Sequence, residues 1–308
     1  MKRRKLRRKK NKKKNTFLLL VLLSIIIILY FKIFKTEKRR IAIEGFGMLE
    51  ENLSSKAVGV YNLNSGEIIF EKSPDLKVAP ASLAKLFVID YALTILDMDE
   101  IVYIGEEIYL VQEDSSLAYI QPGEMKVEDI IKAMLIPSGN DAANALAAAS
   151  GRRIAGEETL NPQDAIDLFI DRLGEYLLQE GYQNTNITVP SGYNDENYTN
   201  IIDLKKVSFK LLENPVISNI VSSPYYIYTD DNGNTLKWEN TNEMLNTSSR
   251  YYNPDITGVK TGSLDNNYNL ISRYSRDEDY LIIVIGAGHA STRYYETDEI
   301  ISILEANR

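Results

Sequence analysis

Ala79-Pro-Ala-Ser-Leu-Ala-Lys-Leu86 places a serine, Ser82, three positions before a lysine, Lys85. Pro80 is favoured at the first position of a helix, and the apolar residues that follow predict a buried helix from Leu83 to about Ile95. Residues at positions i and i+3 lie on the same face of a helix. The pattern therefore predicts that the Ser82 hydroxyl and the Lys85 amine are neighbours.

A hydroxyl beside an amine can carry out acyl transfer when the amine is neutral, which requires a pKa lowered by burial or by nearby cations. The Ser82 N–H, at a helix start, would help to hold the oxyanion that forms. The only histidine, His289, follows an apolar run and reads as a loop residue, so we expect lysine to be the base. Alone this spacing is a weak signal, because Ser-x-x-Lys arises by chance roughly once in a chain of this length.

A second motif, Ser138-Gly-Asn140, lies between two predicted helices, residues 127–136 and 141–149. A loop at such a break can point the Ser138 and Asn140 side chains into a cleft. The alternative is an ordinary turn in which Asn140 caps the second helix.

A third motif, Lys260-Thr-Gly262, ends a short strand-like run. A lysine and a hydroxyl at a strand edge can bind a carboxylate, and glycine lets a substrate backbone approach closely. By composition, this triplet is expected in about one chain in twenty of this size. The alternative is a strand end followed by a turn.

Strand patterns lie at both ends of the chain after residue 56, with helices between them. The predicted strands are residues 57–63, 67–71, 225–229, 235–239, 256–261, 267–273 and 280–286. Further helices are predicted at residues 161–180, 203–212 and 294–304. This order indicates an α+β fold whose antiparallel sheet is built from the two chain ends and is flanked by helices.

The composition excludes several classes of function. The 308 residues contain no cysteine, which rules out disulfides, thiolate chemistry and zinc–thiolate sites. Residues 1–40 hold 16 Lys/Arg and one acid, which leaves 19 Lys/Arg against 42 Asp/Glu in residues 41–308. Nucleic acid is therefore not an expected partner of the main part of the chain, because its phosphates would be repelled.

The first 56 residues predict a membrane anchor. Residues 1–16 form a basic tail, expected to be cytoplasmic by the positive-inside rule, and residues 17–34 are apolar enough to cross a bilayer once. Residues 35–56 read as a linker, and residues 57–308 as a catalytic domain outside the cell membrane. A cleaved signal peptide is the alternative, but no small-residue cleavage site follows the apolar run.

The three motifs together are far more specific than any one of them. Their joint occurrence in this order is expected by chance in roughly one chain in a hundred or fewer. The combination is close to that of penicillin-binding proteins and serine β-lactamases, with Ser-Gly-Asn in place of Ser-Asp-Asn. Over roughly residues 55–306 the sequence resembles the D-alanyl-D-alanine carboxypeptidase family, the low-molecular-weight penicillin-binding proteins. Further similar segments are Asp114-Ser-Ser116, Gly123-Glu124, Val127-Glu-Asp129, Ile136–Ala143, Thr241–Leu245 and Arg293-Tyr-Tyr-Glu296.

The resemblance implies a β-lactamase/DD-peptidase-like fold with a helical subdomain and a role for each motif residue. Ser82 would attack the peptide bond between the two terminal D-alanines of a peptidoglycan stem peptide, and Lys85 would take its proton. Ser138 would relay a proton to the leaving amine, and Asn140 would orient Lys85 and the substrate amide. No metal or organic cofactor is implied, and β-lactams would act as covalent inhibitors.

The resemblance also implies a subsite for the substrate's terminal carboxylate. Lys260, Thr261 and Arg293 would hold that carboxylate, and Gly262 would let the substrate lie close to the strand. The oxyanion would lie between the N–H groups of Ser82 and Ser263. The residues after Gly262 depart from the family's usual pattern, since Ser263-Leu264 stands where an aromatic residue or His followed by Thr is more common, and Asn266-Asn267 stands where Ala-Gly is.

Three other functions remain open from the sequence. A serine β-lactamase would need a glutamate to activate the deacylating water, and Glu175 is the candidate. A penicillin-binding sensor without catalysis is the second alternative. A transpeptidase is the third, although members of the family of this size mainly use water.

Overall fold

The computed structural model describes residues 20–21, 23–27, 29–30, 45–230 and 233–306. The chain divides into two compact units, Leu53–Asp298 and a smaller one from Met1–Asn52 with Glu299–Arg308. In the smaller unit, the described residues between 20 and 30 are helical and exposed, and a short helix covers residues 45–50. Within the described ranges, no helix is both long and apolar enough to span a membrane. The predicted basic tail, residues 1–16, and much of the predicted anchor, residues 17–34, lie outside those ranges.

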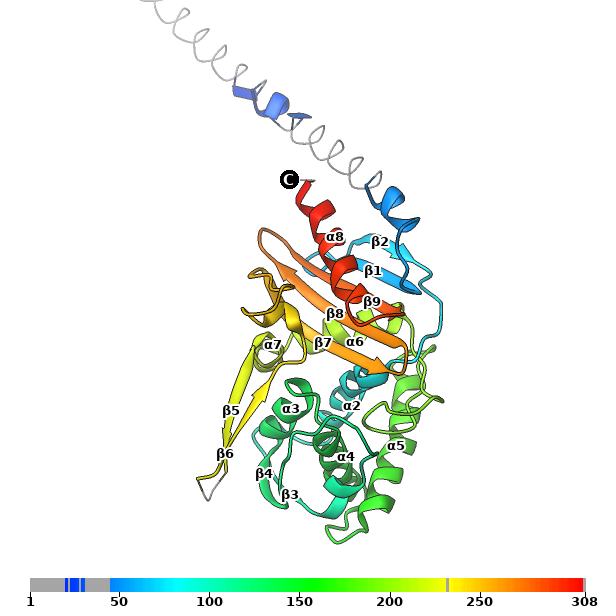
Figure 1. The fold of residues 1–308 in the computed structure, drawn as a ribbon, viewed down its shortest axis with the longest axis vertical. Coiled ribbons are helices and arrows are strands. Elements are labelled where there is room, and N and C mark those ends of the chain that lie inside the picture. The colour runs from blue at the N-terminus through cyan, green and yellow to red at the C-terminus, as the bar shows by residue number, and fades with distance from the viewer. Residues whose placement is uncertain (1–19, 22, 28, 31–44, 231–232, 307–308) are drawn as a thin grey trace, which may run out of the picture. The chain divides into compact units, whose positions relative to one another are not determined.

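The larger unit is built on a five-stranded antiparallel sheet with strand order β2-β1-β9-β8-β7. The two chain ends meet in it, because β1 pairs with β9 (Figure 1). The predicted α+β fold with a sheet from both ends is thus confirmed. The strands are β1 (Ala57–Asn62), β2 (Ile68–Lys72), β7 (Ile256–Leu264), β8 (Asn267–Ser275) and β9 (Asp279–Ala287).

Both faces of this sheet are covered. The first turns of α8 (Thr292–Ala306), up to Asp298, lie across one face, and α6 (Ile201–Leu212) lies against the other (Figure 1). Helix α7 (Pro215–Ser222), which the sequence pattern did not predict, packs on β7. Because neither face meets water, the central strand β9 is an uninterrupted apolar run that is buried from Leu281 to Ala287.

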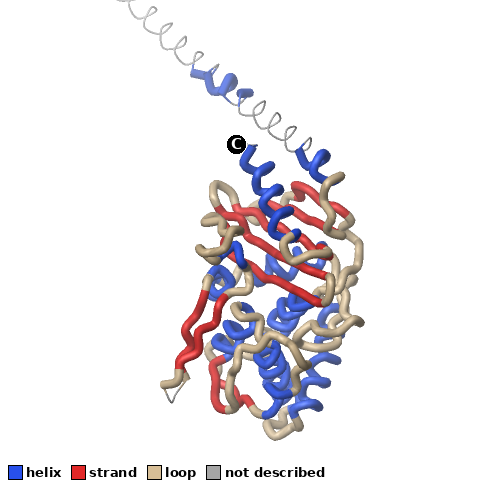
Figure 2. The backbone as a smooth tube through the Cα atoms, in the orientation of Figure 1, coloured by secondary structure: helices blue, strands red, loops and turns tan. Residues whose placement is uncertain are grey.

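The remaining helices gather on the α6 side of the sheet (Figure 2). The alanine-rich α4 is almost entirely buried at their centre, and Gly151 lets the backbone of α5 pass so close that a Cβ there would lie 1.9 Å from the Ala165 oxygen. Side-chain capping by Asn161 starts α5, as predicted. These elements are the 3₁₀ turn η1 (Ala81–Leu83), α2 (Ala84–Ala92), α3 (Val127–Leu135), α4 (Asn140–Ala155) and α5 (Pro162–Gln179).

Two short antiparallel ribbons flank the helices (Figures 1 and 2). One pairs β3 (Ile101–Ile104) with β4 (Gly123–Lys126), and the other pairs β5 (Tyr225–Thr229) with β6 (Thr235–Glu239). The indole N–H of Trp238 on β6 donates to the Ala118 carbonyl over 2.8 Å, which ties the second ribbon to the loop before β4. Together with α7, that ribbon leads the chain from the helical layer back to β7.

Candidate active site

Ser82 lies in η1, directly before α2, and Lys85 lies one turn further on. Their side chains are neighbours as predicted, with Lys85 Nζ 2.9 Å from Ser82 Oγ. Pro80 begins the turn, and Ala81 takes a left-handed backbone conformation with φ of +49°. That conformation is costly for a residue with a Cβ, so it persists only where the surrounding structure enforces it.

The Lys85 side chain is completely buried, and its surroundings favour a neutral amine. Burial lowers the pKa of Lys85 to about 7, against an opposing, smaller effect of the nearby Asp141 carboxylate. Lys85 Nζ also donates to Asn140 Oδ1 over 2.8 Å and to the Ser191 carbonyl over 3.3 Å. A neutral amine has two hydrogens and one lone pair. If a neutral Lys85 directs its two hydrogens at these carbonyl oxygens, its lone pair is left for the Ser82 hydroxyl at 2.9 Å.

The loop between α3 and α4 positions Ser138 and Asn140. Ser138 has a φ of +65°, and the chain is held on either side, with Gly139 N donating to Ala133 O and Asn140 N to Ser116 O. Asn140 is the first residue of α4, and its side chain makes no capping bond but accepts from Lys85. The reading of Asn140 as an ordinary helix cap is therefore wrong.

Lys260 on β7 connects the sheet to this loop. Its Nζ donates to Ser138 Oγ over 2.9 Å and to the Thr261 carbonyl over 3.1 Å, and its side chain is only 1% exposed. Burial lowers the pKa of Lys260, and the positive charges of Lys85 and Arg293 lower it further. Two lysines with lowered pKa values thus face the two serines of the first two motifs.

The end of β7 forms the edge of the site. The Thr261 and Thr241 hydroxyls lie 2.6 Å apart, and Ser263 is exposed. Arg293 on α8 reaches this strand, with Nη1 donating to the Gly262 carbonyl and to Ser263 Oγ, each over 3.1 Å. Strand β7 also passes so close to η1 that a Cβ on Gly262 would lie 2.6 Å from the Pro80 oxygen.

Hydrogen bonds and neighbouring positions in the chain connect all nine predicted site residues along this path, from Ser82 to Arg293. The Ser191 carbonyl, which the sequence pattern did not single out, also contributes to the site. So does the Thr241 hydroxyl, from a segment that resembles the family but for which the sequence predicts no role. Ser191 lies in a Pro-Ser-Gly turn within a loop rich in Asn, Tyr and Gly, and such a turn signal alone does not say what the loop approaches.

The other candidates lie elsewhere or make different contacts. Glu175 is 57% exposed on α5 and forms an ion pair with Arg172 over 2.8 Å. Because it faces solvent, it does not supply the buried carboxylate that the β-lactamase alternative needs. The exposed ring of His289 bonds to Ser291 Oγ over 2.8 Å. Among the described residues, no group of three or more His, Asp or Glu side chains could hold a metal ion.

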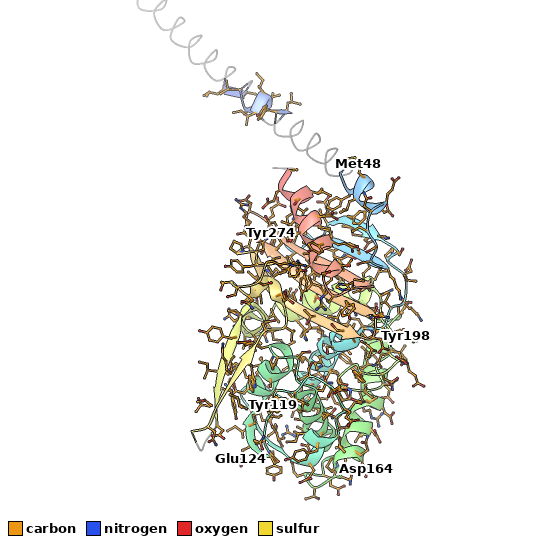
Figure 3. All side chains as sticks on the ribbon, in the orientation of Figure 1. Met48, Tyr119, Glu124, Asp164, Tyr198 and Tyr274 are labelled. Atoms are coloured by element: carbon orange, nitrogen blue, oxygen red, sulfur yellow. The ribbon has the colours of Figure 1, made fainter. Side chains whose placement is uncertain are left out.

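A separate cavity of about 360 Å³ opens between the loop before β4 and the β5–β6 ribbon. Tyr119, Glu124 and Tyr228 are among its lining residues, and Figure 3 labels Tyr119 and Glu124 on this flank of the helical layer. Tyr119 is 66% exposed and follows Ala118, whose N–H donates to Asp141 Oδ1. The cavity thus borders the segment that also contacts the start of α4.

The sequence profile of the family described as D-alanyl-D-alanine carboxypeptidase matches residues 46–288, which is most of the chain. The chain belongs to the D-alanyl-D-alanine carboxypeptidase family. A D-alanyl-D-alanine carboxypeptidase of Haemophilus influenzae, DacA, is 26% identical over 254 residues, which cover 79% of this chain and 59% of that relative. The chain spans about 50–60% of the length of the first curated family members that it matches.

Solved structures agree with this family. The Streptomyces K15 DD-transpeptidase superposes with a TM-score of 0.71 at 23% identity, over 82% of this chain and 98% of that one. Penicillin-binding protein D2 of Listeria monocytogenes, solved in an ampicillin-bound form, gives a TM-score of 0.63 at 27% identity, over 82% and 97% of the two chains. The DD-peptidase-like fold of the carboxypeptidase family is thus confirmed for this chain.

Proposed function

We propose that the chain is a serine D-alanyl-D-alanine carboxypeptidase that removes the terminal D-alanine from peptidoglycan stem peptides through an acyl-enzyme. The observation that carries this proposal is the Lys85 amine, which is buried, has a lowered pKa and lies 2.9 Å from Ser82 Oγ. Family membership supports the choice of substrate. The motif geometry along β7 supports a substrate with a free carboxylate.

Acylation begins with Ser82. Lys85 Nζ takes the hydroxyl proton as Ser82 Oγ forms a bond to the carbonyl carbon of the penultimate D-alanine. The oxyanion lies between the N–H groups of Ser82 and Ser263, which act as fixed dipoles. Both the base and the nucleophile are on one helical turn, which keeps Lys85 Nζ within 2.9 Å of Ser82 Oγ.

Collapse of the tetrahedral intermediate needs a proton on the leaving amine. Ser138, which accepts from Lys260 over 2.9 Å, donates its hydroxyl proton to that amine. The proton that Lys85 took from Ser82 then replaces the one that Ser138 has lost. Asn140 holds Lys85 and receives the substrate amide. The C–N bond breaks, D-alanine leaves, and water then hydrolyses the ester on Ser82.

The substrate's carboxylate is expected at the end of β7. Lys260, Thr261 and Arg293 supply positive charge and a hydroxyl there, and Gly262 leaves room for the substrate backbone. Desolvated cations stabilise an incoming carboxylate more strongly than exposed ones do. Arrival of that negative charge would also raise the lowered pKa of Lys260.

A β-lactam carries a carboxylate and a strained amide and would acylate Ser82 in the same way. The ampicillin-bound structure of the Listeria protein supports this part of the proposal. The exposed position of Glu175 favours a slowly hydrolysed penicillin adduct over the rapid turnover of a β-lactamase. A silent sensor is disfavoured because the acyl-transfer groups are all present and joined by hydrogen bonds.

We further propose that residues 17–34 anchor the chain as a single membrane span, with residues 1–16 in the cytoplasm and the catalytic unit outside. The dense positive charge before the apolar run supports this orientation. An outer location would place the site beside the cell-wall peptides on which it acts.

The proposal is tested with the full chain in detergent, a muramyl pentapeptide and a fluorescent penicillin. We expect mass spectrometry to show the loss of one D-alanine and gel fluorescence to show covalent labelling. Ser82→Ala should abolish both, and Ser65→Ala, in the exposed turn after β1, should change neither. Persistent labelling of Ser82→Ala would remove the nucleophile assignment, and labelling without D-alanine release would favour the sensor.

A further inference from the structure

Asn269 lies on β8, opposite Gly262 of β7, and its side chain is fully buried. The pairing of β8 with β9 slips at this point, so that Asn269 faces two β9 residues instead of one. One of them, Gly286, has a φ of +75°, and its N–H donates to Asn269 Oδ1 over 2.8 Å. The side chain thus satisfies a backbone group that the bulge removes from the strand ladder.

The Asn269 amide nitrogen reaches the segment that precedes the nucleophile. Nδ2 donates to the Ala79 and Pro80 carbonyls, each over 3.0 Å. These are the last carbonyls before Ala81, whose φ is +49°, and Ser82. An amide side chain offers two donor hydrogens and an acceptor, whereas a carboxylate of the same shape offers acceptors only. Asparagine is therefore suited to hold this segment and Gly286 together.

The main chain of Asn269 makes a third connection. Its carbonyl accepts from Arg293 Nη1 over 3.1 Å, the same nitrogen that donates to the Gly262 carbonyl. One buried residue thus contacts the segment before Ser82, the arginine at the end of β7 and the bulge in β9. The neighbouring Asn267 reaches only the Ala79 carbonyl, over 2.7 Å, so it does not make these connections.

We propose that Asn269 is a positioning residue that sets the distance between the Ser82 nucleophile and the subsite for the substrate carboxylate. This inference rests on the proposed function, because it assumes that the substrate carboxylate binds near Arg293. Ser82 and Lys85 share one helical turn, so their pairing survives loss of the Asn269 bonds. Loss of the Asn269 bonds instead changes the position of that turn relative to β7. A misplacement of about 1 Å at a reacting centre can cost about 100-fold in rate.

The test uses two thioesters of the same N-acyl-D-alanine, one with a free carboxylate in its leaving group and one with that carboxylate methylated. For the wild-type chain and for Asn269→Asp we would measure the second-order rate constant of acylation by each compound, together with the melting temperature. Asn267→Ala is the matched control, because it removes a single bond to the same segment. Asn269→Ser provides the same comparison if the aspartate variant does not fold.

We expect Asn269→Asp to slow acylation by the carboxylate compound about 100-fold and by its methyl ester less than about threefold. Asn267→Ala should leave the ratio of the two rates unchanged. In an Arg293→Ala background the Asn269 substitution should no longer alter that ratio, since the arginine contact with the substrate carboxylate that the substitution displaces is then already absent. Equal losses for both compounds, or no loss, would overturn the inference. A wild-type chain that prefers neither compound would instead contradict the proposed carboxylate subsite.

Discussion

At the scale of single residues, the site depends on two buried lysines. An isolated lysine is charged at neutral pH and makes a poor base. Lys85 and Lys260 are both at most 1% exposed, and they lie close enough for the charge of Lys85 to lower the pKa of Lys260. Burial is therefore what makes a neutral amine available at Lys85.

The pKa of Lys85 predicts a pH dependence for acylation. Only the neutral amine can take the Ser82 proton, and its fraction rises with pH until the pKa of about 7 is passed. We expect the rate of labelling by a fluorescent penicillin to rise about tenfold per pH unit below about 7 and to level off above it. Stopped-flow measurements from pH 5.5 to 8.5 provide the check.

Histidine side chains generally titrate in the same range, so His289→Gln is the control for this measurement. The control should keep the wild-type profile. Lys85→Ala should lose the profile together with several orders of magnitude in rate, as removal of a paired base does. A flat wild-type profile would mean that Lys85 does not act as a neutral base.

At the scale of elements, the segment before Ser82 is enclosed by two backbones. Gly262 of β7 approaches the Pro80 carbonyl, and Gly192, in the loop after α5, approaches the Ala81 carbonyl. Gly192 has a φ of +81°, and a Cβ there would lie 2.0 Å from that oxygen. The strained Ala81 thus lies between two backbones that approach it too closely for either glycine to carry a side chain.

We expect Gly192→Ala to destabilise the chain by about 2 kcal/mol or more and to slow acylation at least about tenfold. The matched control is Gly174→Ala in the middle of α5, where a Cβ meets no atom within 4 Å. That control should stabilise the chain by about 0.5–1 kcal/mol, because alanine favours a helix over glycine. Denaturant unfolding and penicillin labelling measure both effects. Equal behaviour of the two variants would contradict the close approach.

The elements also show which parts of the site the sequence could predict. The Ser82–Lys85 pair lies within one helical turn, so the spacing of the two residues in the sequence was enough to predict their contact. The same holds for the strand that carries Lys260, whose pattern is local. The contact of Lys85 with Ser191 spans 106 positions, and that of Asn269 with Ala79 spans 190. No local periodicity reports on such contacts, because the chain path between the two residues sets them.

At the scale of the whole molecule, the proposed anchor predicts how the chain partitions. We expect the full chain to remain with membranes after alkaline carbonate extraction, because an apolar span is held by the bilayer and not by charge. A variant without residues 17–34 should be released. A variant with the Lys/Arg of residues 2–14 changed to Gln should stay membrane-bound, which separates insertion from attraction to anionic lipids. Release of the full chain by carbonate would contradict the span.

The sheet topology also affects how the protein is made. Strand β1, buried along its whole length, pairs from Ala57 to Asn62 with Ile285 to Tyr280 of β9. A ribosome delivers β1 early and β9 late, so most of the growing chain carries an apolar strand with one open edge. Such an edge is prone to aggregation until its neighbour arrives. A nascent chain stopped before residue 279 would have Ser82 and Lys85 but no β9, so its β1–β2 pair would not yet be joined to the β7–β8 pair that carries Lys260.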